Sequence, residues 1–434
     1  MKVLFLFQGN THYFNLIASK INKQPGIELI YVCPKAKAST SIGEGVFQTK
    51  NGADFEIVEM AEQMNTDYNS LWYPDLPLFL RERKPDIILT SEFHIKSLFL
   101  DKEVKTIIKE RGIKVILKSI PFQIEKYDIQ LKKINDQIKN NPLPSFNSLP
   151  AIIGKILKFL KFDFLYKRIF VDKEIQSVLL KKLEIQKESY NFPDAHVNYI
   201  EEAFDIFGSY GVSKEKIHIT YNSPDTDFLF SVKEKIEEKG PIAKNKFRII
   251  HLSRLVEWKR VDMLVTAVAN LKNQYPEMEL MVVGEGPEKE KLIAQAASLN
   301  VSDRIQFLGG VYDPEQLGTH LMSSSIYTLA GMGGLSINDA MIFGLPVICS
   351  VCDGTEKFLV KEGFNGLYFK KDDQKSLESK IKFFFDNPEK CIIMGENSVQ
   401  IIKNEINIHT VVKGYMGAFN YVKKGNLKLA SIEK

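Results

Sequence analysis

The sequence predicts an α/β protein built from two doubly wound parallel sheets. Both halves of the chain alternate short apolar runs with helical patterns, which is typical of strand–helix–strand units. The apolar runs are unbroken, as expected for parallel strands that helices cover on both faces. The chain has 434 residues, of which 44% are hydrophobic and 26% charged, so it is globular and too long for one ordinary core.

The first half opens with an apolar run at residues 3–7 that predicts a buried strand. A polar turn containing Gly9 follows, and an amphipathic stretch then predicts a helix to about Ile21. Further short apolar runs predict strands at 29–32, 87–89 and 115–117. The helical patterns between these runs complete a series of βαβ units.

The second half repeats the alternation from Phe247 onward with clearer boundaries. Strands are predicted at 248–252, 279–283, 305–308, 326–329 and 346–350. Helices are predicted at 261–273, 288–299, 313–322 and 336–343. Between the halves, the charged stretch 233–246 contains Gly240 and Pro241 and is typical of a linker or a surface hairpin. We therefore expect the domain boundary near 222–227.

Composition excludes several classes of protein. The four cysteines are too few and too scattered for a disulfide scaffold, which indicates a reducing compartment, and we expect the cytoplasm. Cys349 and Cys352 form a C-x-x-C pair without a second pair or a histidine cluster nearby, so we expect two buried thiols and no metal site. The first apolar run is too short for a signal peptide or a spanning helix. The formal net charge of +4 is too small and too spread to indicate nucleic-acid binding.

A segment near 124–192 concentrates the positive charge, because residues 126–187 contain thirteen Lys or Arg against six Asp or Glu. Within it, residues 151–170 predict an amphipathic helix. Its basic arc contains Lys155, Lys158, Lys161 and Arg168. Such a helix can lie in the interface of an anionic membrane. The alternative interpretation is that its apolar side packs on the domain while the lysines are solvated.

The residues expected to carry chemistry follow predicted strands of the second half, because ligands of open parallel sheets bind beyond the carboxyl ends of the strands. Arg254 and Lys259 follow the first of these strands and precede a helix. Two cations beside a helix amino terminus suit a diphosphate.

A glycine-rich turn with Gly331, Gly333 and Gly334 follows the strand at 326–329. Glycine lets backbone N–H groups approach phosphates closely. The next helix carries Asp339, whose carboxylate could accept ribose hydroxyls. This stretch is the most informative part of the sequence.

These motifs resemble, in their order, the sugar-nucleotide-binding half of retaining glycosyltransferases of family four, which have the GT-B fold. The resemblance rests on SRLVEWK, VVGEGP, DRIQFLG, GGLSINDAMIFGLPVI and DGTEKFL. It is strong over 247–371 and moderate over 194–227, where the sequence is similar to the interdomain crossing of the family.

The resemblance implies two Rossmann-like domains that face a central cleft. The acceptor-side domain would cover 1–224 and include the basic insert near 124–192. The nucleotide-sugar-binding domain would cover 225–410, and a carboxy-terminal helix in 411–434 would return to the first domain.

The resemblance also implies roles for individual residues. Arg254 and Lys259 would neutralise the diphosphate, whose charge grows as the anomeric bond breaks. The backbone N–H groups of Gly333, Gly334 and Leu335 would contact that diphosphate. Asp339 matches the second glutamate of the family motif, which binds ribose.

Three further residues follow from the same resemblance. Gly9 would lie in the glycine loop of the first domain that faces the donor. The peptide SEFHIKS is similar to an acid-x-His element of the family, so His94 would contact the donor sugar or the reacting centre, and a surface histidine is the alternative. Glu356 is the next carboxylate at the donor rim.

The chain departs from the family at the E-x7-E motif, because glycine stands at the first position and aspartate at the second, Gly331 and Asp339. The family commonly uses the first glutamate to bind the donor sugar. Some relatives have a glycine-rich P-G-x-x-G-L sequence instead, and AGMGGL is closer to that subgroup. Backbone donors would then replace the carboxylate.

We therefore expect a metal-independent retaining glycosyltransferase that moves a sugar from a UDP- or GDP-sugar to a glycan or lipid-linked acceptor, in surface polysaccharide or glycoconjugate biosynthesis. No D-x-D metal pair follows a predicted strand of the second domain, so the two cations must neutralise the diphosphate. The basic insert suggests an acceptor at the inner membrane face, with the protein bound peripherally.

Two alternative functions are compatible with the sequence. The absent glutamate at Gly331 would suit a non-catalytic partner of another transferase. A GT-B epimerase acting on the nucleotide sugar would need acids from both domains, and the sequence offers only Glu92 and Glu356.

Overall fold

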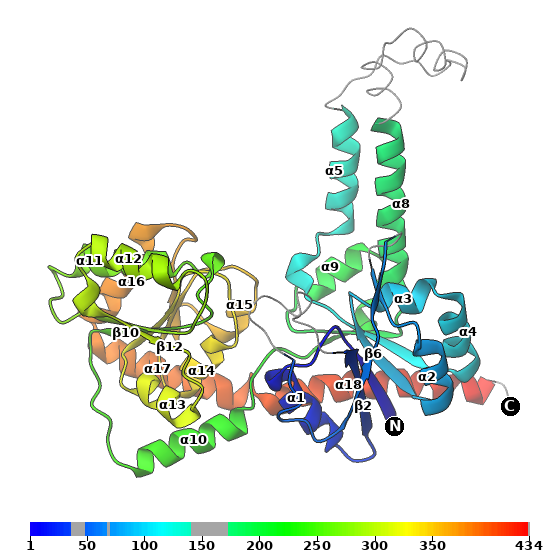
Figure 1. Ribbon diagram of the computed structural model, residues 1–434, viewed down its shortest axis with the longest axis horizontal. Helices are drawn as coiled ribbons and strands as arrows, with labels where there is room; N and C mark the ends of the chain where they lie inside the picture. Colours follow the sequence, from blue (N-terminus) through cyan, green and yellow to red (C-terminus); the bar gives the residue numbers. More distant parts are fainter. Residues whose placement is uncertain (36–47, 67–69, 140–171, 433–434) are drawn as a thin grey trace, which may run out of the picture. The chain divides into compact units, whose positions relative to one another are not determined.

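The computed structural model describes residues 1–35, 48–66, 70–139 and 172–432 (Figure 1). It is an α/β protein whose two large sheets are parallel, which confirms the predicted fold class. The chain divides into two compact units, one formed by Met1–Ala61 and Ile219–Gly417 and the other by Glu62–His218 and Ala418–Lys434.

The first large sheet has seven strands in the order β3-β2-β1-β6-β7-β8-β9. The strands are β1 (Lys2–Leu6), β2 (Glu28–Pro34), β3 (Glu56–Met60), β6 (Ile87–Ser91), β7 (Lys114–Lys118), β8 (Ala195–Asn198) and β9 (Ile217–Ile219). The associated helices are α1 (His12–Asn22), α2 (Leu76–Arg83), α3 (Ile95–Leu100), α4 (Lys102–Arg111), α5 (Tyr127–Lys139), α8 (Asp172–Asn191) and α9 (Ala203–Ser209). A small antiparallel hairpin joins β4 (Gln63–Asn65) to β5 (Ser70–Trp72).

The second large sheet has six strands in the order β12-β11-β10-β13-β14-β15. The strands are β10 (Arg248–Leu252), β11 (Glu279–Val283), β12 (Ile305–Gly309), β13 (Ile326–Leu329), β14 (Val347–Cys349) and β15 (Gly366–Tyr368). The helices that follow in the chain are α10 (Thr226–Glu238), α11 (Val261–Leu271), α12 (Lys289–Ser298), α13 (Pro314–Met322), α14 (Ser336–Ile342), α15 (Glu356–Leu359), α16 (Gln374–Asp386), α17 (Pro388–Asn404) and α18 (Ile408–Ile432). The last of them, α18, belongs to the other unit from Ala418 onward. Every strand and helix predicted in this half is present within three residues of its expected ends.

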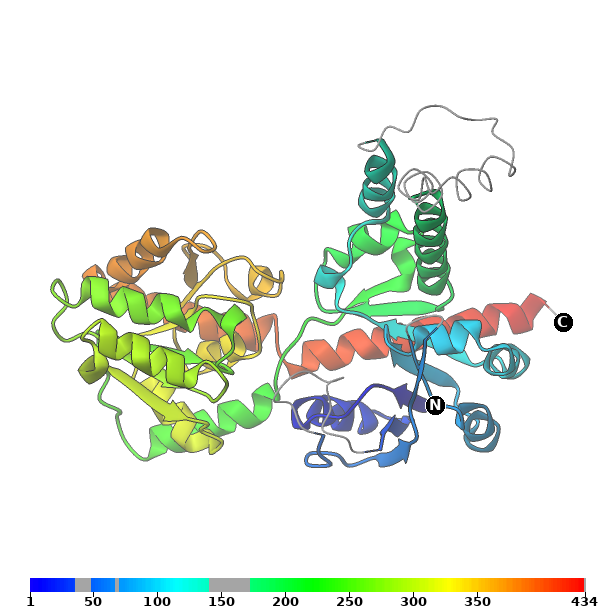
Figure 2. The same cartoon turned by 45° about the horizontal axis from the view of Figure 1, so that its top comes forward.

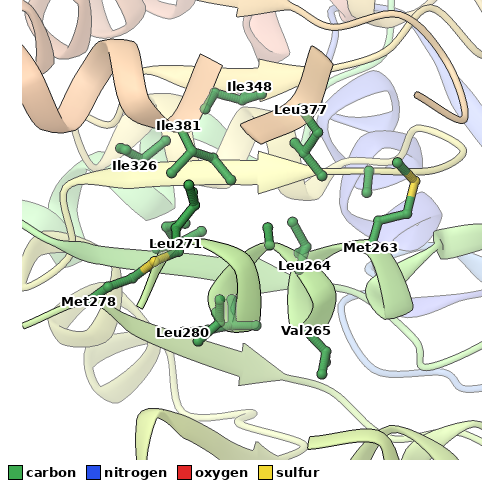
Figure 3. Close-up of a cluster of buried hydrophobic side chains, with 14 of the residues drawn as sticks. Met263, Leu264, Val265, Leu271, Met278, Leu280, Ile326, Ile348, Leu377 and Ile381 are labelled. Carbon is green, nitrogen blue, oxygen red and sulfur yellow. The ribbon is translucent and has the colours of Figure 1, made fainter. Parts of the chain in front are cut away.

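The core of this second half packs helices against the parallel sheet (Figure 3). Leu264 of α11 and Leu280 of β11 are fully buried, and Leu377 and Ile381 of α16 belong to the same cluster. Apolar side chains on both sheet faces leave the strand ends as the place where polar loops can form a site.

Local chemistry explains where several helices begin. The Thr11 side chain accepts a hydrogen bond from the Phe14 amide at the start of α1. Asp101 caps α4 through two backbone amides, and Asp225 caps α10 through the Phe228 amide. These residues satisfy N–H groups that the first helical turn leaves unpaired.

One sequence interpretation between the halves is wrong. The stretch expected to be a linker at 233–246 is helical as far as Glu238, because α10 places Val232 and Ile236 against the core while most of its charged residues are exposed. The segment 194–227 contributes β8 and β9 to the first sheet, and the chain passes from one compact unit to the other within it, between His218 and Ile219. Its interpretation as the interdomain crossing of the family stays a prediction.

Part of the basic segment forms a pair of helices, α5 and α8, which run side by side in both views (Figures 1 and 2). Tyr127 of α5 donates a hydrogen bond of 2.5 Å to Glu184 of α8, and the Lys187 amine lies 4.8 Å from the Tyr127 ring centroid. The amphipathic helix predicted at 151–170 lies outside the described residues. Among the helices that are described, none is both long enough and apolar enough to cross a membrane.

Candidate functional site

Three loops follow neighbouring parallel strands of the second sheet, β10, β13 and β14. The first contains Arg254 and a short 3-10 helix, Glu257–Lys259. The second is the glycine-rich turn, and the third runs from Ser350 to Thr355. Because the carboxyl ends of parallel strands meet at one sheet edge, residues more than 90 positions apart in the sequence come together here.

Lys259 joins the first two loops. Its Nζ donates hydrogen bonds to the backbone oxygens of Met332, at 2.7 Å, and Gly333, at 2.6 Å. The structure thus brings this predicted cation onto the predicted glycine turn, with the residue only 8% exposed.

The charges around Lys259 favour an anionic ligand. Burial and, to a smaller extent, the nearby Arg254 charge together lower the pKa of Lys259 to about 8, while Asp353 acts in the opposite direction. Arg254 is itself half-buried. Two partly buried cations repel each other, and both are stabilised when an anion such as a diphosphate binds between them.

Steric contacts at the glycine turn explain its composition. An ideal Cβ on Gly331 would lie 2.0 Å from the Trp258 backbone oxygen, and the Met332 amide donates to that same oxygen at 3.0 Å. A Cβ on Gly333 would lie 3.0 Å from the Asp353 carboxylate oxygens, whereas one on Gly334 would meet only the Lys259 amine, at 3.4 Å. The first glycine therefore allows two backbone segments to touch.

Leu335 and Asp339 lie where the turn enters α14. The Asp339 amide donates to the Leu335 oxygen at 3.2 Å. Asp339 is half-buried, and burial raises the pKa of its carboxyl from 3.8 to about 7. The Asn338 side chain donates to the Asn222 oxygen at 3.3 Å and helps to fix the helix.

The Glu356 side chain is buried against the backbone of the third loop. Glu356 is 1% exposed, and its Oε1 accepts hydrogen bonds from the amides of Cys352, at 2.7 Å, and Gly354, at 3.2 Å. Burial and the charge of Asp353 raise the pKa of the Glu356 carboxyl. In this position the side chain shapes the loop.

Two further residues lie on the third loop. Cys352 is half-buried, whereas a buried thiol was expected, and its Sγ donates to the Gly331 oxygen at 3.3 Å. Asp353 stands in the D-G-T sequence four residues after the end of β14 and was noted at this strand end without being chosen as a site residue. It is 9% exposed, and its Oδ1 accepts hydrogen bonds from the amide and hydroxyl of Thr355.

The two site residues predicted in the first half have different surroundings. Gly9 follows β1, and its carbonyl oxygen accepts a 2.8 Å hydrogen bond from Tyr31. His94 follows β6 and is fully buried, so the alternative of a surface histidine is wrong. Its Nε2 lies 2.9 Å from the Glu62 carboxylate, and its ring stacks on Tyr73 with centroids 4.9 Å apart.

His94 and Glu92 both have shifted proton affinities. Burial lowers the pKa of His94, and no residue in the described ranges hydrogen-bonds its Nδ1. With a carboxylate at Nε2, the neutral ring holds its proton there and leaves Nδ1 as an acceptor. Glu92 accepts from the Ile120 amide at 3.2 Å, and burial raises its pKa to about 7.

Comparison with known proteins finds a family similarity in the second half. Residues 232–400 match the family described as "Glycosyl transferases group 1". An uncharacterized glycosyltransferase of Methanocaldococcus jannaschii is 29% identical over 271 residues, which are 60% of this chain and 65% of that protein. The alpha-monoglucosyldiacylglycerol synthase of Acholeplasma laidlawii is 26% identical over 38% of this chain and 41% of that protein. The chain thus spans less than two-thirds of the length of these relatives.

The fold extends further than the sequence similarity. The crystal structure of Anabaena Alr3699/HepE in complex with UDP superposes with a TM-score of 0.63, covering 97% of this chain and 100% of that one at 16% identity. Both Rossmann-like domains are therefore shared with a protein of known structure.

Proposed function

We propose, from the premise that this chain carries a glycosyl transferases group 1 domain, that it transfers a sugar from a UDP- or GDP-sugar to a glycan or lipid-linked acceptor with retention at the anomeric carbon. The observation that carries the proposal is the placement of Lys259 on the glycine turn beside Arg254. The retaining mechanism and the choice of a UDP- or GDP-sugar as donor are proposed from the family resemblance of the motifs.

The cation cluster suits the chemistry of a departing nucleotide diphosphate. Breaking the anomeric bond transfers charge to the β-phosphate, and fixed positive groups stabilise that charge most in the transition state. Arg254 and Lys259 would supply this stabilisation from the protein itself. We propose on this basis that the transfer is metal-independent.

The acceptor is proposed from the relatives and the basic segment. The printed name of the Acholeplasma laidlawii relative describes the synthesis of a glucosyl diacylglycerol, which is a membrane lipid. We propose that the basic segment near 124–192 attaches the chain peripherally to an anionic membrane. Flotation with vesicles containing anionic lipid, weakened by salt, would support attachment, and failure to float at low salt would remove it.

The donor proposal is tested by calorimetry with EDTA present. UDP, GDP and their common sugars are titrated into wild type, Arg254→Ala and the control Arg111→Ala, in which an exposed arginine of α4 is removed. We expect one nucleotide class to bind wild type and the control. Loss of a charge-assisted hydrogen bond of about 1.5–3 kcal/mol should weaken binding to Arg254→Ala by at least tenfold.

Two results would contradict the donor proposal. Equal binding by Arg254→Ala and wild type would exclude the diphosphate role of this arginine. No binding of any nucleotide by the folded wild type would favour the non-catalytic partner, which Gly331 already suggests by lacking the motif glutamate.

A further inference from the structure

We propose that Asp353 recognises the hydroxyl groups of the transferred sugar, and so takes the place of the carboxylate that the family motif has at the position of Gly331. This inference rests on the proposed function and adds to it a specificity-determining residue. The substrate group concerned is the glycosyl part of a nucleotide diphosphate sugar.

The structure excludes a carboxylate at position 331 without a change of backbone. The ideal Cβ there would lie 2.0 Å from the Trp258 oxygen and 2.6 Å from the Lys259 carbonyl carbon. Backbone atoms cannot rotate out of the way as a flexible side chain can. A sugar-binding acid must therefore come from another loop.

Asp353 lies on the loop that is adjacent in the sheet. Its strand, β14, pairs with β13, and Leu329 aligns with Cys349 at their ends. Both carboxylate oxygens of Asp353 are 3.0 Å from the place where a Cβ on Gly333 would be. The absent side chain thus leaves room for this carboxylate against the glycine turn.

The carboxylate is also held in position. The Thr355 amide donates to Oδ1 at 3.0 Å, and the Thr355 hydroxyl donates to the same oxygen. Glu356 fixes the backbone on both sides of Asp353 through the amides of Cys352 and Gly354. A carboxylate has about four lone-pair sites, and within the described residues both donors to Asp353 come from Thr355 and reach Oδ1.

The neighbouring charge connects this carboxylate to the donor. Asp353 interacts with Lys259, whose amine contacts the Met332 and Gly333 oxygens of the same turn. The transferred sugar is bonded directly to the diphosphate that Lys259 would bind. With the diphosphate on Lys259, hydroxyls of the attached sugar would be placed to donate to the remaining acceptor positions of Asp353.

The test compares Asp353→Asn with wild type and with Asp303→Asn, which removes an exposed carboxylate remote from the three loops. Asparagine keeps the oxygen that accepts from Thr355, so the loop should remain folded, and a thermal melt checks this. Calorimetry measures the Kd of the nucleotide diphosphate alone and of its nucleotide sugar for each protein.

We expect Asp353→Asn to leave the Kd of the nucleotide diphosphate within about twofold and to raise the Kd of the nucleotide sugar by about tenfold or more, as for lost hydrogen bonds to a charged group. Thr355→Val should also raise the Kd of the nucleotide sugar relative to the Kd of the nucleotide diphosphate, but by a smaller factor. It removes only one of the two donors that orient the Asp353 carboxylate.

Two results would overturn this inference alone. In the first, Asp353→Asn binds the nucleotide diphosphate and the nucleotide sugar as tightly as wild type does. In the second, its affinities for both ligands fall by the same factor. Failure of wild type to bind any nucleotide diphosphate would overturn the proposed function, and this inference with it, so the two failures are distinguishable.

Discussion

Replacing Gly331 by alanine should destabilise the second domain and weaken nucleotide binding together. The added Cβ would lie 2.0 Å from the Trp258 backbone oxygen, whereas real Cβ contacts essentially never fall below 3.0 Å. The short helix Glu257–Lys259 would therefore have to move by about 1 Å, and it carries Lys259 with it.

The cost follows from the contacts that this movement breaks. Loss of the hydrogen bond between the Met332 amide and the Trp258 oxygen costs about 1 kcal/mol, and overpacking adds about 1–3 kcal/mol. The sum is about 2–4 kcal/mol in the free energy of unfolding. At roughly 2–4 °C per kcal/mol for a domain of this size, Tm should fall by about 5–15 °C.

Thermal melts and nucleotide calorimetry measure the two effects with matched controls. Gly334→Ala should keep the wild-type Tm, because its Cβ would meet only the end of the flexible Lys259 side chain, at 3.4 Å. Gly208→Ala in α9 should also melt normally, because no atom lies within 4 Å. Gly331→Glu, which restores the family residue, should be at least as destabilised as the alanine variant.

A wild-type Tm in Gly331→Ala would refute the reasoning, because it would mean that the two backbone segments are not in contact. A gain of donor binding in Gly331→Glu would equally contradict the steric argument. It would show that the turn can accept the motif glutamate in the ordinary way.

Three further predictions concern pH, protonation and packing. Asp339→Asn should remove a pH dependence of stability. The folded-state pKa of Asp339 is raised from 3.8 to about 7, so the wild-type free energy of unfolding should fall by on the order of 4 kcal/mol as the pH rises from about 4 to above 7. Urea unfolding that shows the same change in free energy between pH 5 and pH 8 in wild type and variant would contradict this. Because the pKa of Lys259 is about 8 in the free protein, nucleotide binding at pH 8 should be accompanied by the uptake of a fraction of a proton at Lys259. The heat of binding should then change with the ionisation enthalpy of the buffer. Identical heats in different buffers would exclude this proton uptake. Leu264→Ala should cost about 2–5 kcal/mol in urea unfolding, since the side chain is 1% exposed in the core, and a cost below 1 kcal/mol would show that the site collapses.

Five strands of the second sheet, β10 to β14, could be predicted closely because each is a short, mainly apolar run bounded by polar loops. The edge strands β3 and β15 could not, because β3 has five residues of mixed exposure and β15 has only three residues, so neither gives a periodic signal. The charged end of α10 was interpreted as a linker because its apolar contacts, Val232 and Ile236, are only two residues among many charged ones.

The candidate site divides in the same way. Arg254, Lys259 and the glycine turn were predictable because cations and glycines after parallel strands suit phosphate groups. The burial of His94 and the role of Glu356 in shaping a loop were not predictable, because both depend on tertiary contacts. His94 packs against Glu62 and Tyr73, and Glu356 accepts from the Cys352 amide.

The sequence by itself determined the order of strands and helices, the cations and glycines at the strand ends, and the absence of the motif glutamate at position 331. Only the tertiary structure decided that this glycine touches the Trp258 backbone and that Asp353 lies against Gly333. The physical reason is that strand patterns are local, whereas contacts between loops depend on which strands are neighbours in the sheet. The loops that contain residues 258, 331 and 353 come together because β10, β13 and β14 are adjacent.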